Sequence, residues 1–552
     1  MFTFVFSKSR WLIASFWMLL FFTSCSSKKA VELILYNGTI YTVDSTFSMA
    51  QCVAIQDGKI VAVGSNEAIA SAYHATRVFD LQGKPVYPGF IDAHCHFYGA
   101  GVDLKKIDLY GTKSYQDVLN RLIASKAKTF SGWIFGRGWD QNDWQNNAYP
   151  DKTALDSLFP NTPVFLMRVD GHAALVNQKA LDLAGFNANT NFEGGEVVLK
   201  DKQPTGMLID NAAEAMVKFV PEPSLQDRKE ALLSMQKKCF AAGLTTVDDA
   251  GIDYRTVQLI DSMQQLDLLK MRIYAMINYD SINTDYFFKT GKLKTPRLNV
   301  RSFKVYADGA LGSRGACLLA PYSDQAGHVG FLLHSTAFFK KAAVDLYAHN
   351  FQMNTHCIGD SANRLMLRVY GDVLLGKNDL RWRIEHAQVV DKKDLELFAK
   401  YAVIPSVQPT HATSDMYWAG ERLGAARLKC AYAYKELLSQ TGKLALGTDF
   451  PVEQINPLLT FYAAVVRKDA KDYPEQGFQP ENALSRQEAL KGMTRWAAFA
   501  NFEEQEKGSI EPGKFADLVV LDQDILKVDG NSIPKVRVLQ TFSNGEVVYH
   551  AN

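Results

Sequence analysis

The middle of the chain alternates short apolar runs that end in polar residues with longer segments of helical periodicity. This alternation is typical of βα units, in which a buried parallel strand is followed by a helix that packs on the sheet. Eight such runs predict an α/β fold of the TIM type, a (β/α)8 barrel with its chemistry at the carboxyl ends of the strands. The runs are VYPGFIDAHCHF, GLTTVDDAG, MRIYAMINYD, FKVYADGA, FQMNTHCIGD, RWRIEHAQVV, AVIPSVQPTH and KLALGTDFP.

One further apolar run, PVFLMRVDG, would make a ninth strand. We assign it to an insertion after the first barrel strand, at about residues 99–220, inside a barrel domain of residues 87–505. The chain has no internal repeat and no long low-complexity linker, so we expect one large domain to account for most of its length.

Both ends of the chain show shorter segments rich in β-branched residues, which predict antiparallel strands. Asn37-Gly38 and Asp57-Gly58 each lie between two such segments, and Asn544-Gly545 does the same near the C-terminus. Dipeptides of this kind tolerate the positive φ angles of tight hairpin turns. We therefore predict a small β-sandwich domain assembled from residues 25–86 and 506–552.

The first 24 residues have a different character. Lys8 and Arg10 precede an apolar run, Trp11–Phe22, that is too short to span a bilayer, and small residues follow it. This order predicts a signal peptide, and its end resembles a bacterial lipobox in which Cys25 becomes the lipidated N-terminus. We expect an exported lipoprotein, anchored through Cys25 on the periplasmic or extracellular face of a membrane. A plain signal peptide and an uncleaved anchor are the alternatives.

Composition narrows the range of partners. The 552 residues are 47% hydrophobic and 22% charged, as in an ordinary globular protein. Sixty basic residues face 59 acidic ones, so no polyanionic partner is indicated and we expect no nucleic acid. The six cysteines other than Cys25 show no paired or C-x-x-C spacing, and we expect free, mostly buried thiols.

Histidine is sparse, with eleven in the chain, yet four of them, besides His411, fall at the ends of predicted strands. His94 and His96 project to the same side of the first strand, because alternate residues of a strand share a face. His356, His386 and Asp449 end three other strands. An H-x-H pair alone is a weak signal, but this set at one end of a barrel predicts a site for zinc or another divalent metal.

These features resemble a known family. The motif PGFIDAHCH, the strand-end histidines and the tail KGSIEPGKFADLVVLD are similar to the amidohydrolase superfamily. Five further motifs resemble its branch called amidohydrolase family 3, which includes N-substituted formamide deformylases. They are GRGWDQNDW, RVDGHAALVN, GLTTVDDAG, FKVYADGALGSRGA and LGTDFPVEQINPL, and with the tail they cover nearly the whole mature chain.

The resemblance implies a binuclear centre with two divalent ions, for which we expect zinc. His94 and His96 would hold the more buried ion together with Asp449, and His356 and His386 would hold the second.

Lys304 lies on the strand where binuclear members carry a lysine carboxylated by carbon dioxide. A carbamate could bridge two ions, which an ammonium cannot do, and the pKa of a lysine is readily lowered by burial. The alternative is an unmodified strand-end lysine that forms a salt bridge.

The chemistry follows from the properties of such ions. Two metals about 3.5–4 Å apart can share a water and lower its pKa towards about 7. Asp449 would accept the proton of this water and pass it to the leaving nitrogen, acting as general base and then as general acid. His172 or His386 would stabilise the oxyanion, and the sequence does not decide between them.

We therefore predict a hydrolase that cleaves a C–N bond of the amide, imide or N-formyl type, other than a peptide bond, in a small molecule. The alternatives are a single-metal hydrolase or deaminase with an unmodified Lys304, and a periplasmic binding protein without catalytic activity. The pattern indicates neither the substrate nor the oligomeric state.

Several other residues have two interpretations or none. The insertion contains a polar-aromatic cluster that predicts either a pocket wall or an aromatic core, formed by Arg137, Trp139, Asp140 and Trp144. Asp308 and Arg314 could pair with each other to fix a loop. His411 ends a predicted strand but receives no role.

Overall fold

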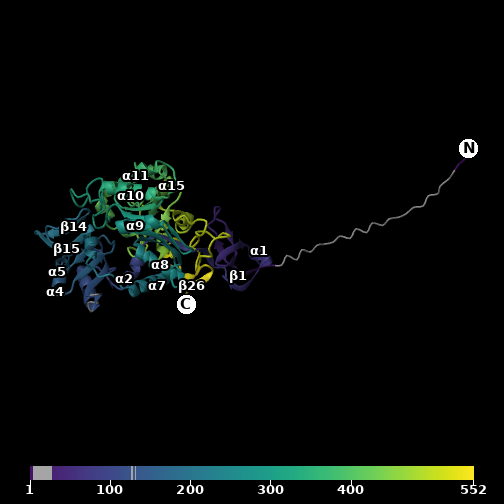
Figure 1. Ribbon diagram of the computed structural model, residues 1–552, viewed down its shortest axis with the longest axis horizontal. Helices are drawn as coiled ribbons and strands as arrows, with labels where there is room; N and C mark the ends of the chain where they lie inside the picture. The colour runs from purple at the N-terminus through teal and green to yellow at the C-terminus, as the bar shows by residue number, and fades with distance from the viewer. Residues whose placement is uncertain (4–27, 126–128, 131, 552) are drawn as a thin grey trace.

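The computed structural model describes residues 1–3, 28–125, 129–130 and 132–551 (Figure 1). The predicted signal segment from residue 4 onward and its cysteine, Cys25, lie outside the described residues. Within the described ranges, none of the helices combines the length and the apolar character needed to cross a bilayer.

Eight parallel strands form the barrel, and they are the eight predicted runs in the predicted order. They are β8 (Phe90–Cys95), β16 (Leu244–Ile252), β17 (Arg272–Asn278), β19 (Leu298–Tyr306), β20 (Gln352–Cys357), β21 (Arg383–His386), β22 (Ile404–Val407) and β23 (Ala445–Leu446). A two-residue strand, β18 (Leu293–Lys294), pairs antiparallel with β19. The predicted TIM-type fold is confirmed.

The segment after β23 meets β8 and closes the barrel. The backbone N–H of Asp449 donates to the carbonyl of His94 at 2.8 Å, and that of His96 donates to the carbonyl of Phe450 at 2.8 Å. Gly447 allows this approach, because a Cβ atom at that position would lie 2.5 Å from the backbone nitrogen of His94. The closure therefore brings Asp449 beside the two histidines of β8.

Helices follow the strands along the chain and pack on the barrel. The largest hydrophobic cluster joins strand residues such as Phe303 and Ile384 to helix residues such as Phe339 and Met366. The longest helix of the described residues, α7, begins at a capping box formed by Ser224 and Asp227. The helices are α2 (Phe97–Asp103), α7 (Leu225–Ala241), α8 (Tyr254–Gln265), α9 (Ser281–Thr290), α10 (Thr336–Ala348), α11 (Asp360–Leu374), α12 (Leu395–Lys400), α13 (Pro409–Asp415), α14 (Ala419–Leu428), α15 (Tyr434–Thr441), α16 (Pro457–Val466), α17 (Arg486–Gly492) and α18 (Arg495–Ala500).

Two further sheets form the β domain, which contains strands from both ends of the chain as predicted. Leu35, Val53, Leu518 and Phe542 belong to one buried cluster between these sheets. One sheet has the order β5 (Lys59–Gly64), β4 (Cys52–Gln56), β1 (Lys29–Tyr36), β6 (Tyr73–Asp80), with α1 (Asn66–Ala72) between β5 and β6 along the chain. The other has the order β26 (Glu546–His550), β25 (Val538–Ser543), β24 (Leu518–Leu521), β7 (Pro85–Pro88), β2 (Thr39–Tyr41), β3 (Met49–Ala50).

The turn predictions are partly wrong. Asp57-Gly58 joins β4 to β5 and Asn544-Gly545 joins β25 to β26, both in hairpins with positive φ. Asn37-Gly38 instead leads from β1 in one sheet to β2 in the other. Leu81 packs so closely against Gly38 that a Cβ there would lie 2.6 Å from Leu81 Cδ1, and the chain changes sheets at this contact. The expected antiparallel order also fails in part, since β1 pairs with β6 and β2 pairs with β7 in parallel.

A separate sheet follows α2 in the chain, and PVFLMRVDG lies in it as β12 rather than in the barrel. The strands are β9 (Ile107–Asp108), β10 (Thr129–Phe130), β11 (Trp133–Trp139), β12 (Val164–Arg168), β13 (Ala173–Val176), β14 (Gly195–Lys200) and β15 (Gln203–Asp210). Its helices are α3 (Tyr115–Ala124), α4 (Thr153–Leu158), α5 (Gln178–Ala184) and α6 (Asn211–Val217). We call residues 107–217 the insert; Figure 1 shows it at the opposite end of the molecule from β1 and α1.

The aromatic residues of the insert and the cysteines are mainly structural. Trp139 and Trp144 are buried with ring centroids 5.9 Å apart, so they form an aromatic core. The cysteines of the described chain are free, and most of them are buried, as expected; they are Cys52, Cys95, Cys239, Cys317, Cys357 and Cys430.

Candidate metal centre

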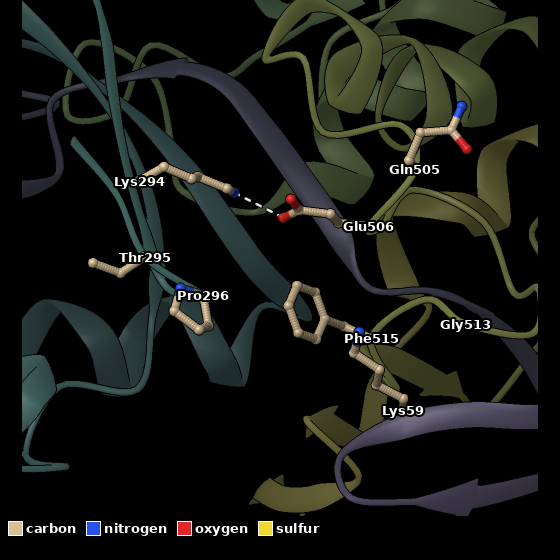
Figure 2. Close-up of a pocket in the computed structure, with 8 residues that line it drawn as sticks. All are labelled: Lys59, Lys294, Thr295, Pro296, Gln505, Glu506, Gly513 and Phe515. Carbon is tan, nitrogen blue, oxygen red and sulfur yellow. Dashed lines mark hydrogen bonds and ion pairs between the residues drawn. The ribbon is translucent and has the colours of Figure 1, made fainter. Parts of the chain in front are cut away.

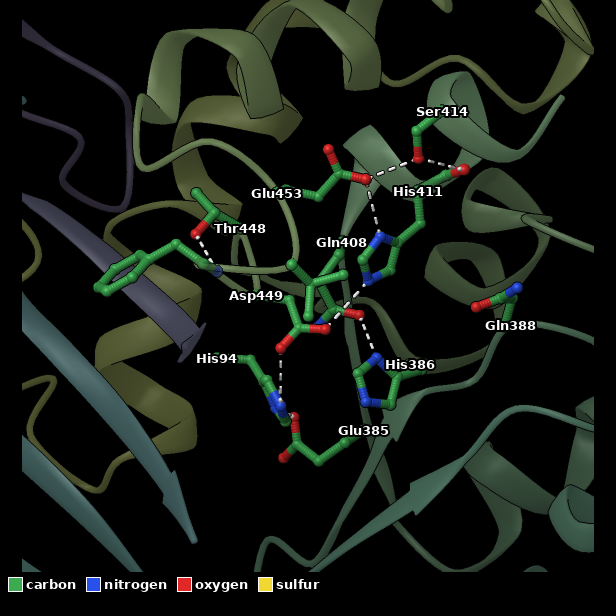
Figure 3. Close-up of polar contacts among 12 residues, drawn as sticks. His94, Glu385, His386, Gln388, Gln408, His411, Ser414, Thr448, Asp449 and Glu453 are labelled. Carbon is green, nitrogen blue, oxygen red and sulfur yellow. Dashed lines mark hydrogen bonds and ion pairs between the residues drawn. The ribbon is translucent and has the colours of Figure 1, made fainter. Parts of the chain in front are cut away.

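Three predicted ligands converge at the carboxyl ends of the barrel strands. His94 ends β8, His386 ends β21 and Asp449 follows β23. One ligand atom from each lies within 4.8 Å of the others, and all three residues are buried (Figure 3). Such a distance is compatible with a single ion held between two imidazoles and a carboxylate.

The other three predicted ligands lie around this group. His96 Nε2 is 3.2 Å from Asp449 Oδ1, and Lys304 Nζ is 3.1 Å from His94 Nε2. The ring of His356 lies 4.5 Å from that of His386 between centroids. The structure thus brings all six predicted ligands together. It places His386 close to His94 and Asp449, whereas the resemblance assigned His386 to a second ion with His356.

Three of the histidine rings are held by a partner at Nδ1. His94 Nδ1 donates to Glu385 Oε2 at 2.6 Å, and His386 Nδ1 donates to Gln408 Oε1 at 2.7 Å. His96 Nδ1 donates to a backbone carbonyl at 2.9 Å. Each of these bonds places the hydrogen on Nδ1 and leaves the lone pair of Nε2 facing the site, which is the usual arrangement around metal-binding histidines.

The carboxylate of Asp449 shows that this donor set fits a cation. Its Oδ1 atom is buried and has no hydrogen-bond partner among the described residues, although it lies 3.6 Å from His94 Nε2 and 3.2 Å from His96 Nε2. The hydrogen of His96 is on Nδ1, so its Nε2 atom faces this oxygen with a lone pair, and the two lone pairs repel one another. A divalent ion among them would remove this repulsion and satisfy the buried oxygen.

A series of buried ion pairs leads from the candidate ligands into the barrel interior. Glu385, the partner of His94, pairs with Arg383 at 2.7 Å, and Arg383 pairs with Asp248 at 2.9 Å. All of these side chains are fully buried. Burial alone would raise the pKa of Glu385, but the charges of Arg383 and His94 hold it well below its usual value. The sequence did not predict this series of buried ion pairs, because the interior of such barrels is usually filled by apolar layers.

Lys304 is buried beside His94 without a carboxylate within ion-pair distance in the described chain. It is 1% exposed, and burial lowers the pKa of its ammonium group to about 8. Burial, followed by the charge of Lys304, lowers the pKa of His94 to about 4. The alternative of a salt-bridged Lys304 therefore lacks a carboxylate partner among the described residues. Because the pKa is lowered, part of the lysine can be an uncharged amine near neutral pH.

His411 is the main residue that the sequence analysis missed. Its Nε2 lies 3.2 Å from Asp449 Oδ2 and its Nδ1 lies 3.1 Å from Glu453 Oε1, which also accepts a hydrogen bond from Ser414 (Figure 3). Burial opposes protonation of His411, but the two carboxylates raise its pKa well above the usual value. Its position at the end of the run SVQPTH was the available signal.

Backbone conformation at the site is unusual. His386 has a φ of 72° and Asp449 a φ of 63°, values that residues other than glycine rarely adopt. Such strain persists where surrounding contacts fix it, and it is enriched at functional sites.

The insert reaches the centre through His172, which precedes β13. Its Nδ1 lies 2.7 Å from Asp210 Oδ1, and its ring lies 4.9 Å from that of His356 between centroids. Burial opposes protonation of His172, but the hydrogen bond to Asp210 raises its pKa. His356 Nε2 itself lies 3.4 Å from the carbonyl of Gly309.

The remaining candidates have structural partners. Arg314 pairs with Asp324 at 2.8 Å, whereas Asp308 accepts backbone N–H groups of the loop after β20, so the expected pairing of Asp308 with Arg314 is wrong. The reason is that Asp308 is fully buried and the loop amides surround it. Arg137 pairs with Asp103 at 3.2 Å, and Asp140 pairs with Arg168.

A cavity of about 300 Å³ lies away from these residues, between β5, β18 and the segment before β24 (Figure 2). It is lined by Lys59, Lys294, Thr295, Pro296, Gln505, Glu506, Gly513 and Phe515. Lys294 is paired with Glu506 at 2.8 Å, and none of the candidate ligands borders the cavity. In such barrels the active site lies at the carboxyl ends of the strands, and this cavity lies elsewhere. We therefore assign the cavity to the junction between the barrel and the β domain.

Comparisons with known proteins agree with this geometry. The family described as Amidohydrolase family matches residues 77–549. Putative amidohydrolase YtcJ of Bacillus subtilis is 31% identical over 529 residues, covering 94% of this chain and 99% of that protein. N-substituted formamide deformylase of Arthrobacter pascens is 27% identical over 547 residues, covering 94% and 98%. The crystal structure of an uncharacterized metal-dependent hydrolase from Pyrococcus horikoshii aligns with a TM-score of 0.75 and 28% identity, over 90% of this chain and 99% of that one.

Proposed function

This chain belongs to the amidohydrolase family and is a metal-dependent hydrolase, and from that premise we propose that it cleaves a C–N bond of the amide, imide or N-formyl type in a small molecule. The observation that carries the proposal is the buried Oδ1 atom of Asp449, which has no hydrogen-bond partner among the described residues and lies among His94, His96 and His386. The N-substituted formamide deformylase relative supports the bond type.

We propose that two divalent ions, zinc by preference, bind to His94, His96, Lys304, His356, His386 and Asp449. Imidazole nitrogens and carboxylate oxygens are ligands that zinc favours. When bound, such ions lower the pKa of a water molecule and polarise a scissile carbonyl.

Lys304 would take part as a carbamate. Its neutral amine would form a bond to the carbon of carbon dioxide and release one proton, which leaves an anion with two oxygens. The lowered pKa of Lys304 and its position beside His94 Nε2 favour this reaction, since only the uncharged amine is nucleophilic.

Asp449 would move the proton. Its Oδ1 atom faces the ligand nitrogens and would bind the ion. Its Oδ2 atom would accept a proton from the attacking water and then pass it to the leaving nitrogen. His411, whose Nε2 lies 3.2 Å from Oδ2, and Glu453 keep the carboxylate oriented for both roles.

His172 is the better candidate for stabilising the oxyanion. His386 already contributes to the tight group of ligand atoms, whereas His172 approaches from the insert and its side chain is 16% exposed. A donor that faces the reacting carbonyl in a buried site is worth more than it would be in water.

A single-metal hydrolase or deaminase is the second candidate. It is favoured by the compact group of His94, His386 and Asp449 and by the contact of Lys304 with His94, which an unmodified lysine makes. The metal content per chain separates the two, because the binuclear site needs two ions and the carbamate.

The test combines metal analysis with a screen of N-acyl and N-formyl amides. We expect purified protein to hold divalent metal, to hydrolyse members of the panel and to lose activity when a chelator removes the metal. Metal-loaded protein that binds but never cleaves any amide of a broad panel would support a binding protein instead.

We also propose that the protein is exported and anchored by a lipid on Cys25, which rests on the order of basic, apolar and small residues alone. The Cys25→Ala protein should leave the membrane fraction and appear in soluble fractions. Unchanged fractionation with membranes would contradict the anchor.

A further inference from the structure

The insert delivers a paired histidine and carboxylate to the edge of the metal centre. His172 precedes β13 and Asp210 ends β15, next to the antiparallel pair Ala173 and Ile209, and the N–H of Asp210 donates to the carbonyl of His172 at 2.7 Å. Their side chains are joined as well, with Nδ1 of the imidazole 2.7 Å from Oδ1 of the carboxylate. The imidazole lies against His356, so the pair borders the centre directly.

Asp210 is held in a strained backbone conformation. Its φ is 48° and its ψ is −120°, a combination that lies outside the regions open to residues with a Cβ. The residue that follows fixes the segment, because Asn211 Nδ2 donates to the carbonyls of Glu193 at 2.7 Å and Leu333 at 2.9 Å. Strain of this kind persists only where neighbouring contacts impose it.

The barrel loop after β19 has room for this carboxylate. A Cβ at Gly309 would lie 2.3 Å from Asp210 Oδ2, and one at Gly315 would lie 2.1 Å from the same atom. Oδ2 is buried and has no hydrogen-bond partner in the described chain. The imidazole of His172 is therefore the one hydrogen-bond partner of the Asp210 side chain there, although a carboxylate can accept several.

We propose that Asp210 is a positioning residue that holds His172 against the substrate, so that the scissile amide lies between the barrel and the insert. This inference rests on the proposed function. Asp210 itself is out of reach with a side chain that is 0% exposed, whereas the side chain of His172 is 16% exposed. With Nδ1 engaged by Asp210, the Nε2 edge of the ring is the part that a ligand can contact.

The experiment measures binding of acetohydroxamate, a small metal-binding analogue of an amide, to cobalt-loaded protein through the visible spectrum of the cobalt ion. His172→Ala and Asp210→Ala should each raise Kd by about tenfold, the factor expected for one hydrogen bond. Cobalt content should stay unchanged. The double variant should bind no more weakly than His172→Ala, because Asp210 acts only through His172.

Thr205→Val, on the same strand β15, is the matched control, since it removes a hydrogen bond to the carbonyl of Val198 without touching the pair or the segment that fixes it; its Kd should equal that of the wild-type protein. Asp210→Leu has a side chain of similar shape that accepts no hydrogen bond, and it replaces Asp210→Ala if that variant does not fold. Equal losses in Thr205→Val and Asp210→Ala, or losses that add in the double variant, would overturn the positioning role. A wild-type cobalt spectrum that acetohydroxamate leaves unchanged would instead overturn the proposed function together with this inference.

Discussion

Arg272, at the amino end of the barrel, and Asp449, at the carboxyl end, are both buried charges, but their surroundings differ. Arg272 Nε and Nη2 donate to Asp517 at 2.6 and 3.2 Å, its Nη1 donates to the carbonyl of Pro296, and its guanidinium carbon lies 3.7 Å from the ring centroid of Phe515. Asp449 keeps one buried oxygen without a partner among the described residues. A buried charge with every group matched serves the fold, whereas an unmatched oxygen that faces the nitrogens of other candidate ligands indicates the place of an ion.

The largest expected effect follows from removing the unmatched charge. Asp449→Asn keeps the size of the side chain and one oxygen that can bind the ion but removes the proton acceptor, so kcat should fall by about 10²–10⁴-fold, the range of positioned acid–base catalysis. Because the histidines remain, the variant should fold and hold at least one metal ion. Steady-state kinetics on any amide found by screening measures this, and near wild-type turnover would exclude Asp449 as the proton carrier.

Lys304→Ala tests whether this buried lysine, which has no carboxylate partner among the described residues, is part of the same centre. We expect less than two metal ions per chain and a loss of most activity, with partial recovery when short carboxylic acids replace the carbamate. Elemental analysis of the purified variant gives the metal content. Full metal loading with undiminished turnover would remove the bridging role and favour the unmodified lysine.

Some features of the barrel and its site could be predicted from the sequence, and others could not. The barrel strands were predictable, because each is an apolar run with a polar end, and so were the candidate ligands at those ends. His411 was missed because its contacts come from Glu453 and Asp449, about 40 residues away, and no local pattern encodes them. The buried Arg383 and Glu385 were missed because charge in a barrel interior contradicts the expected apolar filling.

Glu385→Gln should have an intermediate effect. The amide can still accept from His94 Nδ1, but it no longer balances the charge of Arg383 or strengthens the imidazole as a ligand. Loss of such outer partners typically weakens metal affinity by about 10–100-fold. Competition with a chromogenic chelator measures this. Unchanged metal affinity would mean that the buried ion pairs of Glu385, Arg383 and Asp248 stabilise only the fold.

Arg272→Met should have the smallest effect on catalysis and a clear one on stability. The substitution leaves Asp517 buried without its partner, which costs about 3–5 kcal/mol in the free energy of unfolding. Turnover per folded molecule and metal content should stay unchanged, because the contact lies at the other end of the barrel. Thermal denaturation measures the stability, and steady-state kinetics with metal analysis measures the turnover and the metal content. Loss of metal in this variant would contradict the claim that the two ends of the barrel have separate roles.

The most direct test of the account is an anomalous difference map collected at the zinc absorption edge from crystals of the zinc-loaded protein. We predict two peaks, one about 2.0–2.2 Å from the Nε2 atoms of the β8 histidines and from Asp449 Oδ1, the bond lengths expected for zinc. A map with no peak beside Asp449, and with its Oδ1 atom hydrogen-bonded to a protein group or to water, would contradict the claim that this unmatched oxygen marks a metal site.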